Sequence, residues 1–287
     1  MNKLSDSTVK NKYIIRISLI SSVILSIISW GYVLFESRYS LPGLFSLHTV
    51  TETKEFISKL MGFEQNLSLA YQFNSWFELR HLAFETLLMS ICSIGIAGII
   101  ALTTCIFASR NFHDDTIFGY SRPLLKLVYF IVRNIYSFTR AIPELILAII
   151  LMLFLTPGIW VAAIALAIHN VGVLGKLYSE CIEDMDITAL KSLQSSGARG
   201  WQLLSYAVLP QLLPKFLTYL LYRWEVVIRT TVVVGLVSAA GLGREFRLSF
   251  SYFHYEDLGL LLLWYIVLVI IVDLLCSLLR QFITVRY

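Results

Sequence analysis

Long apolar stretches, separated by shorter polar intervals, run along the chain. Each has about the 20 residues or more that an α-helix needs to cross the hydrocarbon core of a bilayer. No strand-like alternation of apolar and polar positions is evident, and a lipid-embedded backbone must satisfy its own hydrogen bonds. The pattern therefore predicts an all-α integral membrane protein with six spanning helices, at about residues 15–35, 82–109, 125–156, 158–177, 215–240 and 258–279.

Two of the predicted spans contain residues that interrupt helices. Pro143 lies within the third span and removes one backbone donor, which predicts a kink. Gly235 and the Gly241-Leu242-Gly243 turn end the fifth span and permit a tight re-entry. Such breaks suit a pore that opens alternately to the two sides of a membrane. Pro and Gly are also frequent in ordinary membrane helices, so both interpretations stay open.

Composition and charge support the same class of protein. Of the 287 residues, 57% are hydrophobic and 15% are charged, whereas a soluble domain carries about a quarter charged residues. Thirteen of the 23 Lys and Arg residues fall on the side of the N-terminus and six on the other side, which predicts that both termini are cytoplasmic. The first apolar run, residues 17–35, exceeds the signal-peptide core of about 7–15 residues and is interpreted as a retained span.

The longest polar interval after residue 80 spans residues 176–214, between the fourth and fifth predicted spans. The charge distribution places it in the cytoplasm. Asp186-Ile187-Thr188 offers a helix N-cap, and residues 189–196 are expected to form two helical turns. Gly197 suits the left-handed position that ends such a helix. The interval is therefore interpreted as a structured docking surface rather than a simple connection.

The second half of this interval, residues 198–209, is expected to restart as a helix that Pro210 closes. The resulting helix-turn-helix would lie at the membrane surface. Leu190 and Leu193 are three residues apart and share one helical face, so they are candidates to enter a groove on a partner. From the spacing alone an ordinary amphipathic loop fits equally well.

Several charged residues fall inside or near the ends of the predicted spans: Arg133, Arg140, Arg223 and Arg229. A charge at the bilayer centre costs about 2.5–3.5 kcal/mol on insertion scales, so it usually faces protein or water. Arg140, Arg223 and Arg229 are candidates for transient contact with an oxyanion, because a guanidinium binds such oxygens in a bidentate way. The alternative is structural, since Glu225–Arg229 and Arg140–Glu144 have the spacing of i,i+4 helix pairs.

Two further polar residues lie within the predicted spans. His169, in the fourth span, is a candidate for contact with an anion or a carboxylate. A packed, hydrogen-bonded histidine is the alternative. Asp273, in the sixth span, is interpreted as a structural charge that faces other helices.

No catalytic, metal or cofactor site is predicted. Gly175-Lys176 lacks the glycine that a Walker A motif requires at the preceding spacing, so the chain is not expected to bind ATP by a P-loop. The four cysteines form no CxxC pair and are interpreted as apolar filling residues. No Ser-His-Asp order or pair of catalytic carboxylates is convincing. The net charge of +4 gives no support for a nucleic-acid partner.

Several motifs in a fixed order resemble one family of transport proteins. Gly197 followed by Leu209-Pro210 is similar to the cytoplasmic signature of bacterial ABC importer permeases, although Lys191-Ser192-Leu193 stands where the family has Glu-Ala-Ala. Further motifs narrow the resemblance to the phosphonate-family ABC permeases, over residues 82–287: Arg140-Ala141-Ile142-Pro143-Glu144, His169-Asn170-Val171-Gly172-Val173-Leu174-Gly175-Lys176-Leu177, Leu221-Tyr222-Arg223-Trp224-Glu225, Arg229-Thr230-Thr231-Val232-Val233-Val234-Gly235 and Ala240-Gly241-Leu242-Gly243.

The resemblance implies the type I ABC importer permease architecture. Residues 1–81 would hold the N-terminal tail, the first span and a periplasmic segment, and residues 82–287 a five-helix core with its coupling loop at 176–214. It further implies a multi-pass inner-membrane homodimer that is not itself an enzyme. Two ATP-binding subunits would dock below it, and a periplasmic binding protein would deliver phosphonate or phosphite. The residues expected to couple to the ATPase are Leu190, Leu193, Gly197, Ala198, Leu209 and Pro210.

Two other functions remain open at this point. One is a permease of the same architecture for another small solute, such as an amino acid. The other is an ion-coupled carrier or a membrane scaffold that needs no ATPase. A carrier is expected to show inverted repeats and buried acidic coupling residues, and neither is evident. Co-purification of an ATPase would separate the permeases from the carrier or scaffold, and uptake assays would separate the solutes.

Overall fold

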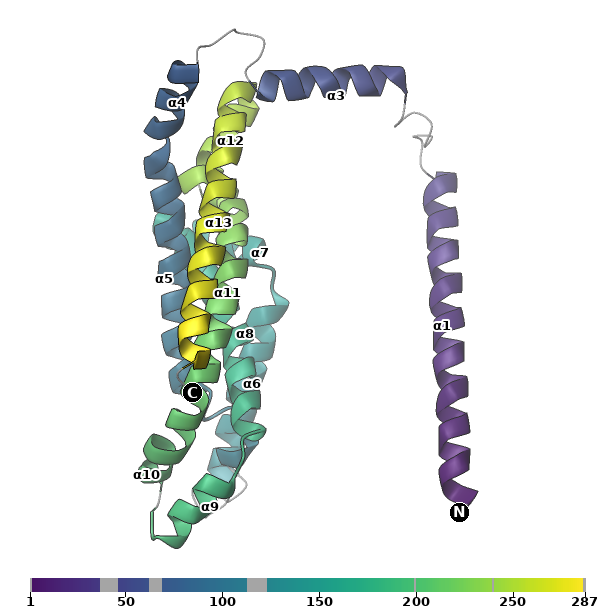
Figure 1. Ribbon diagram of the computed structural model, residues 1–287, viewed down its shortest axis with the longest axis vertical. Coiled ribbons are helices and arrows are strands. Elements are labelled where there is room, and N and C mark those ends of the chain that lie inside the picture. Colours follow the sequence, from purple (N-terminus) through teal and green to yellow (C-terminus); the bar gives the residue numbers. More distant parts are fainter. Residues whose placement is uncertain are drawn as a thin grey trace. The chain divides into compact units, whose positions relative to one another are not determined.

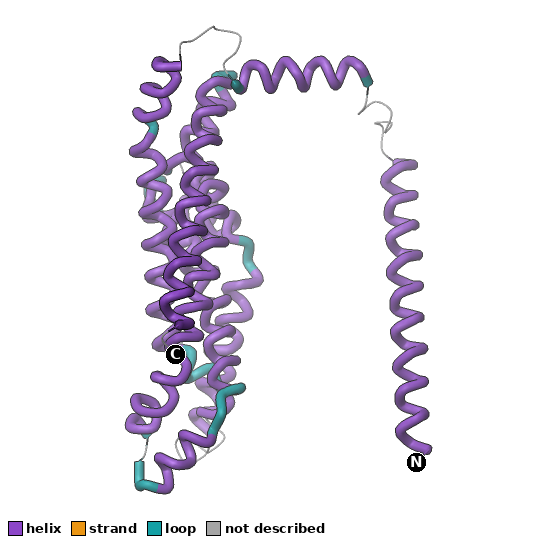
Figure 2. The backbone as a smooth tube through the Cα atoms, in the orientation of Figure 1, coloured by secondary structure: helices purple, strands orange, loops and turns teal. Residues whose placement is uncertain are grey.

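The structure is a computed structural model that describes residues 2–36, 46–61, 69–112, 123–198, 200–238 and 240–285. Within these ranges the secondary structure consists of helices joined by short loops (Figure 2). The chain forms two compact units, Met1–Lys59 and Leu60–Tyr287. The all-α architecture predicted from the hydrophobic pattern is therefore confirmed, while the expected division at residue 82 stays a prediction.

The first unit contains α1 (Asn2–Glu36) and most of α3 (Leu47–Leu60). In α1 the apolar stretch Tyr13–Phe35 has a mean hydropathy of 2.0, and none of it is buried against protein. A helix that is apolar on all sides and has no protein cover is suited to lipid. The first predicted span is thus a helix of adequate length.

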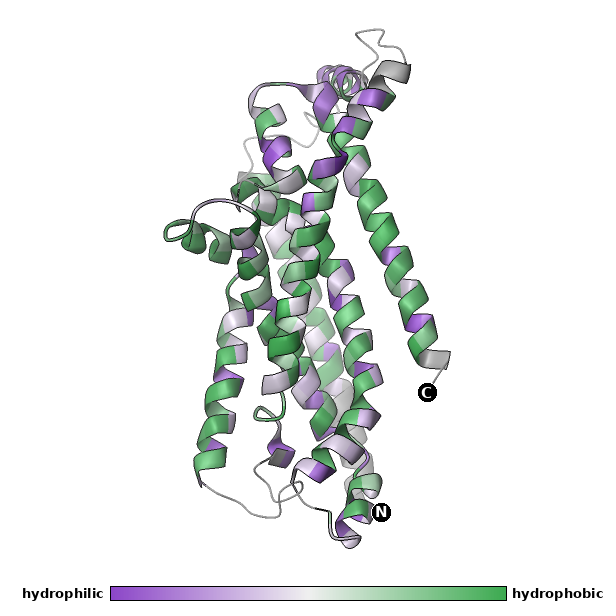
Figure 3. Ribbon diagram, turned by 90° about the vertical axis from the view of Figure 1, so that its left-hand side faces the viewer, coloured by the Kyte–Doolittle hydropathy of each residue, from purple (hydrophilic) through white to green (hydrophobic). Residues whose placement is uncertain are grey.

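The second unit is a helical bundle (Figure 1). It consists of α4 (Leu69–Glu78), α5 (Arg80–Thr104), η2 (Arg110–Phe112), α6 (Pro123–Ala141), α7 (Glu144–Met152), α8 (Ile159–Glu183), α9 (Thr188–Ser195), α10 (Trp201–Leu203), the π-helical turn η3 (Leu204–Val208), α11 (Leu209–Ser238), α12 (Gly241–Ser251) and α13 (Tyr255–Val285). The long helix α8 packs against α5, α6, α7 and α11. Hydrophobic residues predominate along the middle of the long helices (Figure 3).

Small residues on α8 allow its neighbours to approach closely. Ala162, Ala163 and Ala165 are fully buried in the bundle. A Cβ atom at Gly172 would lie 2.2 Å from Thr139 Oγ1, and one at Gly175 would lie 2.3 Å from Tyr136 Cζ. Small residues at three- or four-residue spacing let helix backbones come together within a membrane. The two glycines of the motif at residues 169–177 therefore make room for α6.

The number of spans agrees with the predicted six if each of two bent helix pairs is counted as one span. Four helices in the described part of the chain are long and apolar enough to cross a membrane, and two bent pairs raise the possible number to six. The third predicted span is not one kinked helix, because α6 and α7 meet at 90°. Pro143 is the residue before α7, with ψ at 141°, so the backbone is extended there and the helix ends rather than bends.

The end of the fifth span depends on two glycines. α11 and α12 meet at 55°. A Cβ atom at Gly243 would lie 2.3 Å from the carbonyl oxygen of Val232, and one at Gly235 would lie 2.7 Å from that of Ala240. Glycine at both positions lets the two backbones touch, which makes possible the tight re-entry expected from the sequence.

Candidate functional site

The predicted coupling helix is present as α9, Thr188–Ser195. The carboxylate of Asp186 accepts hydrogen bonds from the Thr188 hydroxyl at 2.6 Å and from the Thr188 backbone N–H at 2.9 Å. These bonds favour the ionised carboxylate and lower the pKa of Asp186 below its usual value. Ile187 occupies the N-cap position and makes no side-chain cap hydrogen bond, so Asp186 holds the first helical residue from the position before the cap.

Gly197 ends α9 in the left-handed conformation, with φ at +88°. Its N–H donates to the carbonyl of Gln194 at 2.9 Å, and the N–H of Ala198 donates to the carbonyl of Leu193 at 3.1 Å. This pair of bonds is a Schellman motif. Leu193 and Ala198 both pack against the main hydrophobic core. The predicted end of the helix is confirmed, and its geometry is fixed by backbone bonds on both sides of the glycine.

Leu190 has a different role from the one expected. Its side chain is 1% exposed and lies in the hydrophobic core of the protein. The expectation that Leu190 enters a groove on a partner is therefore corrected: Leu190 attaches α9 to the bundle, and Leu193 packs partly against the same core. The exposed residues of the helix are mostly polar: Thr188, Ala189, Lys191, Ser192 and Ser195. The apolar face of this amphipathic helix therefore packs against the bundle of the same chain.

Pro210 does not close a helix. The chain turns from α10 into the π-helical turn Leu204–Val208 and continues as α11, in which Leu209 and Pro210 are the first residues. The Leu209 N–H donates to the carbonyl of Leu204, five residues earlier, which widens the helix where proline cannot donate. The wider turn accommodates the proline ring and the helix proceeds. Leu209 and Pro210 thus join the coupling region to the fifth span without a break.

A polar cluster within the bundle joins three of the sequence motifs. Arg223 of α11 donates to Glu144 Oε1 of α7 at 3.2 Å and, through Nε, to the side-chain oxygen of Asn170 on α8. His169 Nε2 lies 3.6 Å from the same Glu144 oxygen, and His169 Nδ1 contacts the carbonyl of Ile142 at 3.0 Å. The side chains of Arg223 and Glu144 are only 19% and 14% exposed. The cluster therefore holds a charge pair largely away from solvent.

This cluster corrects the expected pairing of Glu144 with Arg140. The two residues lie on different helices, because α6 ends at Ala141 and α7 begins after a 90° turn. The i,i+4 spacing in the sequence therefore does not place Arg140 and Glu144 on the same face of one helix. Arg140 is exposed, and it forms no ion pair with any residue that the structure describes. His169 contacts a carboxylate, which was one of its two expected roles.

Arg229 is also paired across helices rather than along one. Its guanidinium lies 2.8 Å from Asp273 on α13, and Arg280 on α13 lies 2.6 Å from Glu225 on α11. The expected Glu225–Arg229 pair is thus wrong, because each residue reaches a partner on the neighbouring helix. Asp273 faces another helix, as predicted. These two pairs fasten α11 to α13 and neutralise the arginine that had been a candidate for substrate contact.

The structure adds one junction that sequence reasoning missed. The side chains of α5 hold the start of α12: Glu85 accepts from the N–H of Gly241 at 3.2 Å, and Thr86 accepts from that of Leu242 at 2.9 Å. Gly241 has φ at +57°, and a Cβ atom there would lie 2.5 Å from Thr86 Oγ1. No local signal points to residues 156 positions earlier in the chain as helix caps.

The described residues offer no cluster for a metal ion: none of their His, Cys, Asp and Glu side chains form a group of three or more that could hold one. Ion pairs such as Arg223–Glu144, Arg229–Asp273 and Arg280–Glu225 connect different helices of the bundle. They are suited to holding these helices in defined positions.

Comparison with known proteins identifies the family. Residues 116–286 match the sequence profile of the family described as "Binding-protein-dependent transport system inner membrane component". The chain is 34% identical over 198 residues to the phosphite transport system permease protein PtxC of Stutzerimonas stutzeri, which covers 69% of this chain and 68% of that protein. It is 32% identical over 162 residues to the phosphate-import permease protein PhnE of Mycolicibacterium smegmatis, covering 56% and 29%. Further relatives are named for phosphite or phosphonate transport.

Solved structures show the same fold. A chain of the MetNI methionine ABC transporter, in an inward-facing conformation, superimposes with a TM-score of 0.63. The match covers 76% of this chain and 99% of that one at 17% identity. The resemblance inferred from the motifs, the type I importer architecture and the role as a transport subunit rather than an enzyme are thus confirmed. The chain belongs to the binding-protein-dependent inner-membrane transport components, and it is a multi-pass permease subunit of an ABC importer.

Proposed function

We propose that this permease imports a phosphorus oxyanion, with phosphonate and phosphite as the expected substrates. The proposal depends on the sequence similarity to permeases that are named for phosphite, phosphate and phosphonate transport. The methionine transporter is similar in fold at only 17% identity, so it gives no support for an amino-acid substrate. A permease for an amino acid remains the alternative that the experiment below tests.

The partners follow from the family. A permease of an ABC importer works with an ATP-hydrolysing subunit and a periplasmic binding protein. The finer proposal is that two ATPase subunits dock on the exposed face of α9, in a complex with two copies of this chain. Support comes from the burial of Leu190, which fixes the helix to the bundle, and from the mostly polar side chains left exposed on the other face. Both chain termini are proposed to lie on the same, cytoplasmic side.

Among the arginines, Arg140 is the best candidate for transient contact with the anion. Arg223 is engaged by Glu144 and Asn170, and Arg229 is engaged by Asp273. An arginine that already faces a carboxylate attracts a passing anion less, because the two charges largely cancel. Arg140 is exposed beside the break between α6 and α7 and has no such partner among the described residues. His169 is proposed to orient Glu144 rather than to contact substrate.

In the proposed cycle, ATP binding closes the two partner subunits beneath the permease. The helix α9 passes the motion both to α8, which ends four residues before it, and to α11, which follows it after α10 and η3. The pore opens outward, accepts the anion from the binding protein, and returns inward after hydrolysis. Alternating access of this kind requires rigid helices and defined breaks, which α8 and the α6–α7 junction provide.

The test is uptake into proteoliposomes that contain the permease with its ATPase and binding protein. Phosphite, methylphosphonate, phosphate and methionine are offered separately. We expect ATP-dependent uptake of at least one phosphorus oxyanion and none of methionine. Arg140→Gln is expected to lower the rate, while the matched Arg229→Gln variant retains it. Methionine uptake, or no dependence on ATP, would contradict the proposed function.

The homodimer is tested separately. Two differently tagged copies of the chain are co-expressed with the ATPase, and one tag is used for purification. Recovery of the second tag is expected from a homodimer. Its absence, together with recovery of a different permease chain, would show that the complex is a heterodimer.

A further inference from the structure

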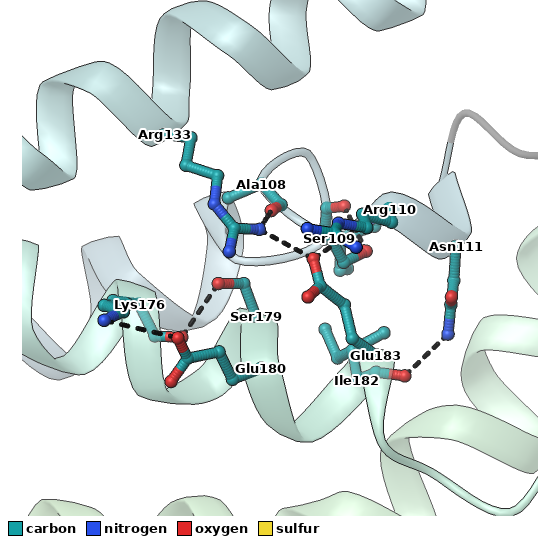
Figure 4. Close-up of polar contacts among 11 residues, drawn as sticks. Ala108, Ser109, Arg110, Asn111, Arg133, Lys176, Ser179, Glu180, Ile182 and Glu183 are labelled. Atoms are coloured by element: carbon teal, nitrogen blue, oxygen red, sulfur yellow. Dashed lines mark hydrogen bonds and ion pairs between the residues drawn. The ribbon is translucent and has the colours of Figure 1, made fainter. Parts of the chain in front are cut away.

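The C-terminus of α8 is held at one carboxylate, and this junction lies directly before the coupling helix. Glu183 is the last residue of α8, and α9 begins five residues later at Thr188. Its Oε1 atom accepts from Arg133 NH1 on α6 at 2.7 Å and from the backbone N–H of Arg110 at 3.0 Å. Figure 4 shows the side chain of Glu183 extended toward these two groups. Three segments that are distant in sequence therefore meet at Glu183.

Neighbouring bonds reinforce the junction. Arg133 also donates to the carbonyl of Ala108 at 3.5 Å, and the Asn111 side chain donates to the carbonyl of Ile182 at 2.7 Å. Glu183 is 16% exposed, so its interaction with the arginine is less screened than that of a surface pair. The end of α8 is thus tied both to α6 and to the turn that follows α5, whereas Arg133 is tied to no part of α7.

The position of Arg133 in the fold suggests what the ion pair does. Arg133 lies on α6, and α6 is the first half of the span that breaks by 90° before α7. The second half, α7, is held to α8 and α11 through Glu144. The charged attachments of the two halves are therefore separate: Arg133 of α6 reaches the end of α8 next to the coupling helix, and Glu144 of α7 reaches the middle of the bundle. The helix α6 also packs against α8 through apolar contacts at Gly175. If α9 is displaced and moves the end of α8, the Glu183–Arg133 ion pair transmits this movement directly to α6.

We propose that the Glu183–Arg133 ion pair is the positioning link through which movement of α9 reaches the α6 half of the broken span. The proposal rests on the proposed function, since it assigns a path to the coupling of ATP hydrolysis and transport. Glu183 and Arg133 act by positioning α6 and contact neither ATP nor substrate. Without the pair, the ATPase subunits still dock and hydrolyse ATP, but α6 follows the motion less completely and fewer anions are moved per ATP.

The chain offers a matched control on the same helix. Lys176 and Glu180 form an i,i+4 ion pair at 3.4 Å within α8, and their side chains are 38% and 39% exposed. Figure 4 shows both residues on the same helix as Glu183. It joins no second helix, so neutralising it is expected to leave any transmission between helices intact.

The experiment measures ATP hydrolysis and anion uptake in the same proteoliposomes, with the ATPase and the binding protein present. Phosphite, phosphate and methylphosphonate serve as probes. Glu183→Gln and Arg133→Gln are each expected to lower the ratio of anion taken up to ATP hydrolysed by about fivefold. The double variant is expected to lose no more than either single variant, because both remove the same link. Glu180→Gln is expected to keep the ratio of the unmodified protein.

Several outcomes would overturn the proposal. An unchanged ratio in Glu183→Gln would do so, as would a double variant whose loss is the product of the two single losses. Failure of Glu183→Gln to co-purify with the ATPase, when Glu180→Gln does so, would show that the pair serves assembly rather than transmission. If instead the unmodified complex moves no phosphorus oxyanion, the proposed function fails and not this inference alone.

Discussion

Glu144 is paired with Arg223, 79 positions later in the chain, and not with Arg140, four positions earlier. The 90° turn between α6 and α7 separates the two nearer residues, and the packing of α7 and α11 beside α8 brings the distant ones together. The pair connects two motifs that the sequence shows only as separate charged residues in apolar surroundings. It is a largely buried contact, and its loss has predictable consequences.

Neutralising one member of this pair is expected to destabilise the protein strongly. Arg223→Gln leaves Glu144 without its guanidinium, and Glu144→Gln leaves Arg223 without a carboxylate. Removal of one partner of a buried pair costs about 3–5 kcal/mol, because the remaining charge stays desolvated. The midpoint of thermal unfolding in detergent measures the effect.

The matched control for this prediction is Glu180→Gln. It breaks the Lys176–Glu180 pair at the polar end of α8, whose side chains are 38% and 39% exposed. An exposed pair contributes about 0–1 kcal/mol, so only a small shift is expected. Equal losses of stability at the two pairs would contradict the assignment of the Glu144–Arg223 pair as the buried structural contact.

Gly197→Ala is expected to weaken the end of the coupling helix. A Cβ atom at residue 197 would meet no heavy atom within 4 Å, so the cost comes from the backbone alone. Holding a non-glycine residue in the left-handed region costs about 1–2 kcal/mol. Amide hydrogen exchange in α9 should therefore accelerate, and stimulation of ATP hydrolysis by the loaded binding protein should fall.

Two further substitutions give this prediction its controls. Gly197→Asn should be milder, since asparagine tolerates the left-handed conformation better than alanine does. Gly95→Ala also adds a Cβ atom in open space, but within the helix α5, and should leave exchange in α9 unchanged. Faster exchange in α9 for Gly95→Ala would show that the effect is not local to the helix end.

Gly175→Ala is expected to disturb the contact between α6 and α8. The added Cβ atom would lie 2.3 Å from Tyr136 Cζ, and that ring is 3% exposed. Tyr136 is also held by a hydrogen bond to Thr104 at 2.5 Å, so it cannot withdraw freely. Overpacking of this kind costs about 1–3 kcal/mol.

Thermal unfolding of Gly175→Ala tests the contact, and a second substitution shows where the strain arises. Replacing Tyr136 by valine in the same chain removes the clashing ring and should make the alanine tolerable. If Gly175→Ala is equally destabilising with valine at residue 136, the strain does not come from the tyrosine.

Acidification is expected to loosen the start of α9 through Asp186. Its folded-state pKa is lowered by the hydrogen bonds from Thr188, so the ionised form is stabilised by folding. The contribution to stability is therefore present above the usual carboxyl pKa of about 3.9 and is lost as the pH falls through the lowered folded value. Hydrogen exchange of the Thr188 amide, compared between neutral and acidic pH after correction for intrinsic rates, measures it.

Asp186→Ala should show the faster exchange already at neutral pH, because it has no carboxylate to lose. Asp184→Ala removes a neighbouring exposed carboxylate and serves as the control. An equal effect of the two substitutions at neutral pH would indicate general electrostatics rather than the specific hydrogen bonds of Asp186.

The sequence alone determined those features that depend on neighbouring residues. The apolar lengths predicted helices for the spans, the glycine at residue 197 predicted the end of α9, and Asp186 predicted its start. The ordered motifs identified the family. The signals for the spans and for the ends of α9 lie within single segments of the chain, because helix propensity, capping and lipid burial are governed by local backbone and side-chain chemistry.

Only the tertiary structure decided which polar residues meet and which faces are covered. Leu190 and Leu193 share a face, but their burial depends on the core beneath α9. Glu225 and Arg229 have the spacing of a helix pair, yet each is bound by α13. A charged side chain in apolar surroundings pairs with the counter-charge that packing brings nearest, and the distance along the chain does not fix that choice.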